Sequence, residues 1–122
     1  MPLDYLDFDY SEDGHGVSTF DAMASTRAHQ ASAVRAEVAS VLAWAHANFP
    51  GARGPLDEDG VWDYDLQAVQ EFAVQDHIDY DEETQQLLVR PGVPGEARHT
   101  FSVSISGTAA FCAAFRQHFL DH

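Results

Sequence analysis

The stretch AHQASAVRAEVASVLAWAHANF, residues 28–49, decides the fold class of this chain, because its apolar residues recur every three or four positions. The apolar stripe at helical spacing consists of Val34, Val38, Val41, Leu42, Ala45 and Phe49. The alanines between them favour a helix, and the Pro50-Gly51 pair that follows would end it. We therefore predict one long amphipathic helix from about Ala28 to Phe49.

The residues before this helix follow a period of two, which is typical of strands. Leu6, Phe8 and Tyr10 alternate with aspartates, and residues 16–25 again favour a strand. The polar, glycine-containing residues 11–16 separate the two segments. We predict a β-hairpin that is closed at this point.

Three more strands and a second helix are predicted after a loop at residues 50–60 that is rich in Pro, Gly and Asp. Residues 61–74 alternate, and their apolar face carries Trp62, Tyr64, Leu66, Phe72 and Val74. Residues 79–86 are expected to turn the chain into a short strand at 87–90, and residues 91–97 form another turn. The next strand, at 99–106, directs His99, Phe101, Val103 and Ile105 inward, and the helical spacing of Phe111, Phe115 and Phe119 predicts the last helix.

This order of elements, ββαβββα, predicts a single α+β domain over residues 1–122. Helices that follow groups of strands usually gather on one face of an antiparallel sheet. We expect a two-layer sandwich in which two helices cover one face of a mostly antiparallel sheet of about five strands.

The charge of the chain restricts its partners. Twenty Asp and Glu residues face six Arg residues and no Lys, for a formal net charge of −14. Such a chain repels nucleic acid and anionic membranes, and it attracts cations and basic proteins. The single cysteine, Cys112, the absence of a signal-peptide pattern and the absence of a long apolar run lead us to expect a cytoplasmic protein.

The strand alternation also predicts an acidic sheet face. If Leu6 and Phe8 face the helices, Asp7 and Asp9 face away, and the later strand directs Asp63 and Asp65 outward in the same way. The sequence does not show whether these strands are neighbours, and an ordinary solvated face is the first interpretation of the pattern. As an interaction surface, it would be joined by aromatic side chains outside the core stripes, namely Tyr5, Trp44 and Tyr80.

A second candidate site is the stretch DYSEDGHG, residues 9–16, which resembles the start of a calcium-binding loop. Asp9, Ser11 and Asp13 provide oxygen atoms at alternate positions, and Gly14 follows where such loops need glycine. The position that should hold a bidentate Glu is occupied by Phe20, which has no oxygen ligand. We therefore interpret the stretch as a hairpin turn and keep a divalent-cation site as the alternative.

Catalytic patterns are weak. The sequence contains no nucleophile elbow, phosphate-binding loop or zinc-binding histidine pair. Cys112 lies in an Ala- and Phe-rich helix, where burial is expected, and His77 and His99 are explained by an acidic turn and a core strand. A small hydrolase or isomerase that pairs a carboxylate with His77 or His99 is therefore our third hypothesis.

The leading hypothesis is a non-enzymatic protein-interaction module, without a cofactor, that binds a basic protein partner. An inhibitor or immunity-like protein that covers a basic nucleic-acid-binding site is one form of it. Whether the chain forms a homodimer is left open by the sequence.

Overall fold

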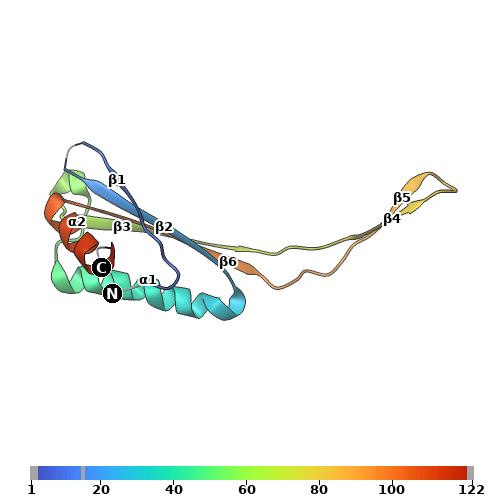
Figure 1. Ribbon diagram of the computed structural model, residues 1–122, viewed down its shortest axis with the longest axis horizontal. Coiled ribbons are helices and arrows are strands. Elements are labelled where there is room, and N and C mark those ends of the chain that lie inside the picture. The colour runs from blue at the N-terminus through green and yellow to red at the C-terminus, as the bar shows by residue number, and fades with distance from the viewer. Residues whose placement is uncertain (1–2, 15, 121–122) are drawn as a thin grey trace.

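The computed structural model describes residues 3–14 and 16–120 of the chain, and its elements follow the predicted α+β pattern (Figure 1). In chain order they are β1 (Asp9–Glu12), β2 (Ser18–Arg27), α1 (Ala28–Asn48), the 3-10 turn η1 (Leu56–Glu58), β3 (Trp62–Glu71), β4 (His77–Asp81), β5 (Gln86–Arg90), β6 (Arg98–Gly107), α2 (Ala109–Phe115) and the π-helical turn η2 (Arg116–Leu120).

The main sheet has four antiparallel strands in the order β1-β2-β6-β3, and α1 and α2 lie on one side of it (Figure 1). The predicted two-layer arrangement is confirmed. One detail differs, because the described residues form six strands in two sheets and β4 pairs only with β5. The acidic residues of 79–86 suggested a turn over the whole segment, whereas the turn occupies only the part between β4 and β5.

The core forms where the two periodic patterns meet. In β2, the alternate residues Phe20, Ala22 and Ala24 are buried, while the residues between them are exposed. In α1, the predicted stripe is buried at Val34, Val38, Val41 and Ala45, and Leu42 and Phe49 pack against it half-buried. Strand alternation and helix periodicity thus direct one face of each element into the same apolar layer.

Aromatic side chains fill the end of the core that α2 covers. The rings of Trp62 and Phe111 stack with centroids 5.5 Å apart and planes 3° apart. Phe115 lies 4.4 Å from the ring of Phe20. Gly107 allows this close packing, since a Cβ at that position would lie 2.3 Å from a ring carbon of Phe111.

The segment before β1 is held to α1 by one carboxylate. Glu37 accepts hydrogen bonds from the backbone N–H groups of Asp4, Tyr5 and Leu6 at 2.7 to 3.2 Å. This contact anchors the segment whose side chains Leu6 and Phe8 are buried in the core. Hydrogen bonds to a charged acceptor are stronger than neutral ones, so Glu37 fixes the path of the N-terminal segment.

Residues 72–97 leave the rest of the molecule as a long two-stranded arm, which contains β4 and β5 (Figure 1). We call this segment the arm and the remaining described residues the body. The arm begins beyond the last strand pair of the body, Glu71 with Arg98. The outgoing and returning segments of the arm are joined by a β-bridge between Val74 and Pro94 and by a hydrogen bond from the Gly95 N–H to the Ala73 carbonyl.

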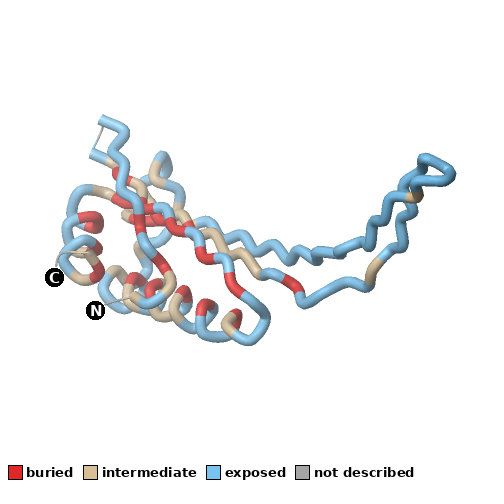
Figure 2. Tube along the Cα trace, turned by 45° about the vertical axis from the view of Figure 1, so that its right-hand side comes forward, coloured by how far each residue is buried: buried red, intermediate tan, exposed pale blue. Residues whose placement is uncertain are grey.

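Nearly all of the arm is exposed, as Figure 2 shows. Phe72 and Val74 were placed by the sequence on the same apolar face as Trp62, but they lie on the arm and are 59% and 48% exposed. The alternation that buries Trp62 continues past the region that α1 and α2 cover. The apolar side chains of the arm therefore have no layer to pack against in the described chain.

Candidate interaction surface

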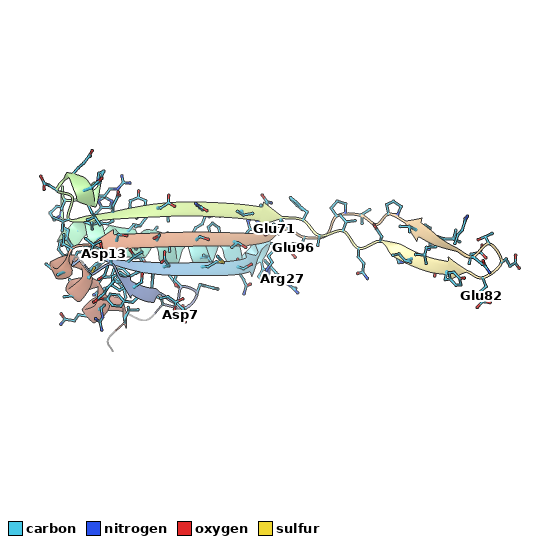
Figure 3. The ribbon with its side chains drawn as sticks, turned by 90° about the horizontal axis from the view of Figure 1, so that it is seen from above. Asp7, Asp13, Arg27, Glu71, Glu82 and Glu96 are labelled. Atoms are coloured by element: carbon cyan, nitrogen blue, oxygen red, sulfur yellow. The ribbon has the colours of Figure 1, made fainter. Side chains whose placement is uncertain are left out.

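The side of the main sheet that faces away from the helices carries one row of side chains across all four strands. Strand register pairs Asp9 with Asp21, Asp21 with Ser104, and Ser104 with Asp65. The three aspartates are exposed and therefore available to a partner. Figure 3 looks onto this outer face, with the helices behind the strands.

The row borders a shallow hollow of about 610 Å³. Its walls include Asp7, Asp9, Asp21 and Asp65, which we call the acidic face, and Ser102 and Ser104 of β6 form part of its floor. Asp7 and Asp9 come from one edge of the sheet and Asp65 from the other. The structure therefore gathers three of the predicted residues into one hollow although their strands are not neighbours.

Asp63 differs from the other predicted aspartates because it already has a cationic partner. Its Oδ1 accepts a hydrogen bond from Arg53 Nε at 2.8 Å and another from the Tyr64 N–H at 2.9 Å. The Arg53 guanidinium also lies 4.4 Å from the centre of the Tyr64 ring. Asp63 is half-buried and partly neutralised, so it presents less negative charge to solvent than Asp65 does.

Asp21 occupies the second position of the row and was not among the residues predicted from the sequence. Its signal was present, since Asp21 stands between the buried residues Phe20 and Ala22 and must point to the opposite face of the strand. The hydroxyls of β6 were expected on the outward side of their strand, but not as part of this row. Thr100, Ser102, Ser104 and Ser106 alternate along β6 on the outer side, where Ser106 hydrogen-bonds Thr19 and Thr100 hydrogen-bonds Ser25.

Tyr5 and Trp44 do not join the acidic face. The Trp44 ring is half-buried and stacks on His118 with centroids 5.2 Å apart, and it also meets Phe119 edge to face at 5.3 Å. Tyr5 lies beside α1, where its N–H bonds to Glu37. Tyr80, the remaining aromatic candidate, is exposed on the arm.

The predicted β-hairpin is present, but the DYSEDGHG stretch begins with β1 and only its later residues lie in the turn to β2, so the turn starts two residues later than the predicted bounds 11–16. Asp9 and Ser11 belong to β1, whereas Asp13 lies in the turn and its Oδ1 accepts a hydrogen bond from the Val17 N–H at 3.2 Å. Over residues 3–14 and 16–120, no group of three or more His, Cys, Asp or Glu side chains is arranged to hold a metal ion.

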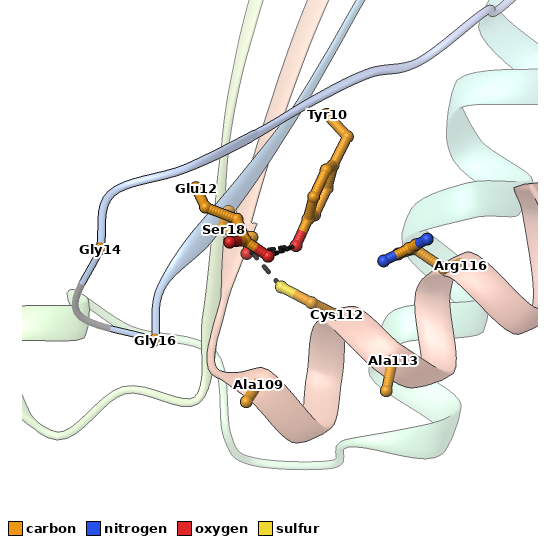
Figure 4. A pocket seen from close by; sticks show the side chains of 9 residues that line it. All are labelled: Tyr10, Glu12, Gly14, Gly16, Ser18, Ala109, Cys112, Ala113 and Arg116. Atoms are coloured by element: carbon orange, nitrogen blue, oxygen red, sulfur yellow. Dashed lines mark hydrogen bonds between the residues drawn. The ribbon is translucent and has the colours of Figure 1, made fainter.

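A second hollow, of about 330 Å³, lies beside Cys112 (Figure 4). Cys112 is buried, as predicted, and its thiol donates to the carbonyls of Gly107 at 3.2 Å and Ser18 at 3.8 Å. Burial raises the pKa of the Cys112 thiol, which opposes formation of a nucleophilic thiolate. The Ser18 hydroxyl also donates to Tyr10, whose own hydroxyl bonds to Glu12. The polar groups of this hollow thus bond mainly to one another.

The two histidines of the third hypothesis lie in separate parts of the molecule. His77 belongs to the exposed arm, where it pairs in register with Arg90. His99 is half-buried in β6, between Thr26 and Gln70 in the sheet register. Neither histidine lines the hollow of the acidic face.

Comparison of the chain with known protein families, with curated proteins and with solved structures finds no match in any of the three. Among the described residues, none of the helices has the length and apolar content needed to cross a lipid bilayer.

Proposed function

We propose that the chain is a non-enzymatic protein-interaction module that binds a basic protein through its acidic face. The observation that carries the proposal is the row from Asp9 through Asp21 and Ser104 to Asp65, which brings carboxylates from three strands to one hollow. Neighbouring carboxylates repel one another, and a cationic partner relieves this repulsion.

The dimensions of the row favour a folded basic surface over a single small cation. Adjacent strands lie about 4.8 Å apart, so the row from Asp9 to Asp65 extends over roughly 15 Å. Two or more arginine or lysine side chains are needed to meet carboxylates at this spacing. Guanidinium groups suit the site because they can bind a carboxylate with two parallel hydrogen bonds, and Ser102 and Ser104 add hydroxyl acceptors.

The net charge of the whole chain supports the same partner. A charge of −14 accelerates encounter with a positively charged protein, and the effect weakens as salt screens it. Proteins that bind nucleic acid carry clustered basic side chains at the phosphate-binding site. In the form of the hypothesis that we favour, the module acts as an inhibitor or immunity-like protein that covers such a site.

The test compares two variants that change the net charge equally. One variant neutralises the row (Asp9→Asn, Asp21→Asn, Asp65→Asn), and the control neutralises three exposed residues in and beside η1 (Asp57→Asn, Glu58→Gln, Asp59→Asn). Binding to an immobilised arginine-rich peptide is measured at several salt concentrations. We expect the row variant to lose at least about tenfold in affinity and the control no more than about twofold. Equal losses would mean that binding follows net charge alone and would refute a specific site.

A further inference from the structure

The hairpin at the end of the arm has one apolar face and one polar face. Register pairs Ile78 with Val89 and Tyr80 with Leu87, so these four side chains share a face. They are 60%, 52%, 60% and 64% exposed, in the same order. On the other face, Asp79 pairs with Leu88, and the flanking pairs are polar. The hairpin is therefore amphipathic, and nothing in the described chain covers its apolar side.

A two-stranded hairpin alone in water is at best marginally stable, and it needs a layer against its apolar face. The exposed apolar surface also extends toward the body through Phe72, Val74 and Val93. Exposed apolar side chains gathered in this way are typical of interaction sites in native proteins. The arm thus presents apolar side chains that no part of the described chain covers.

The body offers a matching apolar groove of about 380 Å³ between α1 and β3. Its lining includes Val38 and Leu42 of α1, Leu66 and Ala68 of β3 and Phe101 of β6. The helix α1 packs against β2 and β6 and leaves this part of β3 uncovered, so that Leu66 is 45% exposed. Within the described residues, β3 has one long strand neighbour, β6, and its other edge has only a single bridge, at Trp62.

The reach of the arm matches the length of this edge. The strand β3 has 10 residues, Trp62–Glu71, and spans about 33 Å at roughly 3.3 Å per residue. Residues 72–81 continue the chain over an equal number of positions, and Figure 3 shows the arm extending away from the end of β3, from Glu71 at its base to Glu82 at its tip. Two copies related by a two-fold axis at the arm base would therefore place each arm along β3 of the other copy. In that arrangement β4 runs antiparallel to the β3 edge, as strand addition requires.

We infer that the occupant of the groove is a second copy of this chain, and that two copies exchange arms. The apolar face of each arm covers the groove beside β3 of the other copy. A two-fold dimer of this kind satisfies both arms and both grooves at once and leaves neither surface free to continue a chain of copies.

The area is sufficient for a stable dimer. Burial of an apolar side chain removes about 60–120 Å² from water, so the seven arm side chains named above provide on the order of 600 Å² per copy. Two arms and the two grooves beneath them together reach the standard interface size of about 1,600 Å². Because each copy carries a charge of −14, the dimer should become tighter as salt screens the repulsion.

The dimer is tested by sedimentation equilibrium of the full chain over a range of protein concentrations, at low salt and at about 1 M salt. We expect a dimer whose dissociation constant falls with salt. The arm variant Tyr80→Ser, Leu87→Ser should raise that constant at least about a hundredfold. Its control, Asp79→Ser, Leu88→Ser, alters the opposite face of the same hairpin and should raise it less than about tenfold. A wild-type chain that stays monomeric, or equal effects of the two variants, would overturn the inference.

A mixing experiment tests the exchange itself. The groove variant Leu66→Glu should also be monomeric, because it places a charge where the partner arm lies. When the arm variant and the groove variant are mixed, one intact arm still meets one intact groove, and a weaker heterodimer should form. Absence of the heterodimer would contradict reciprocal exchange. The row variant of the acidic face should dimerise normally, so failure of the arm inference and failure of the proposed partner site give different results.

Discussion

Removal of the arm should leave the body folded, and this prediction can be worked out quantitatively. Glu71 and Arg98 are paired across β3 and β6, so the ends of the excised segment face each other. An Asn-Gly dipeptide in place of residues 72–97 would join them by a two-residue hairpin turn. The variant keeps every residue of the buried core cluster, because the cluster contains no residue of the arm.

Two terms determine the stability of the protein that lacks the arm. Ala97 is the buried hydrophobic residue that is lost, which costs about 1 kcal/mol. A connection between β3 and β6 that is roughly tenfold shorter lowers the entropic cost of loop closure by about 2 kcal/mol. The monomeric body should therefore be more stable than the monomeric full chain by about 1 kcal/mol, which corresponds to a rise in Tm of roughly 5 °C at this size.

Urea unfolding followed by circular dichroism measures this difference, at protein concentrations low enough to keep the full chain monomeric. The m-value should be nearly equal for the two proteins, because it scales with the surface exposed on unfolding and the arm is already exposed. A loss of more than about 2 kcal/mol, or an m-value reduced in proportion to chain length, would show that the arm packs on its own body and would refute the reasoning.

Three further predictions concern the body. Glu37→Gln should destabilise the fold by about 2 kcal/mol, because a neutral amide replaces a carboxylate that accepts three backbone N–H groups. The control Glu58→Gln should change the free energy of unfolding by less than about 0.5 kcal/mol. Equal effects of the two variants in urea unfolding would contradict the anchoring role of Glu37. Burial raises the pKa of the Cys112 thiol above its ordinary value of 9.0, so the folded state holds this proton more tightly than the unfolded state does. The stability that this thiol contributes is complete below pH 9 and is lost as the pH rises through the folded pKa. The free energy of unfolding of Cys112→Ala should therefore decline less between neutral and alkaline pH than that of the wild type. Chelator-treated protein should melt at the same temperature with and without millimolar calcium if residues 9–16 are only a turn; a saturable rise, about 2.7 kcal/mol at a hundred times Kd, that disappears in Asp13→Ala would instead establish a metal loop.

The sequence predicted the body well because its main elements, β2, β6, α1 and α2, each have one buried face. The stripe of Val34, Val38 and Val41 and the alternation around Phe20 and Ile105 report this directly, since periodicity records which side of an element is apolar. The sequence also correctly predicted that Cys112, in the second helix, is buried. These parts need no information about distant contacts.

Periodicity could not distinguish the arm from the body. Phe72 and Val74 continue the alternation of β3 without a break, and an alternating pattern shows that a strand is amphipathic but not what covers it. What separates Trp62 from Phe72 is whether the helices reach that part of the strand. The helix layer extends only over the strands of the body, which depends on packing between segments distant in sequence.

The acidic face was predicted in part for a similar reason. The alternation gave the outward direction of Asp7, Asp9 and Asp65, but only the strand order brings them to one hollow. The neutralisation of Asp63 depends on Arg53, which lies in a loop without any periodic pattern. Contacts of this kind are set by the path of the loop and leave no local signal.

The acidic face includes aspartates directed away from the helices, whereas the groove lies beside α1, and the linings of the two hollows share only Gln67 and Ser102. A dimer formed through the arms would leave both acidic faces uncovered, so it would present two basic-protein sites instead of one. Two linked sites on one partner assembly bind more tightly than either site alone, which would compensate for the modest affinity of an exposed carboxylate row. Salt would act on the two associations in opposite directions, because it screens the attraction to a basic partner and the repulsion between two copies that each carry a charge of −14. A salt titration of a mixture of the chain and a basic protein should therefore convert the mixed complex into the free dimer.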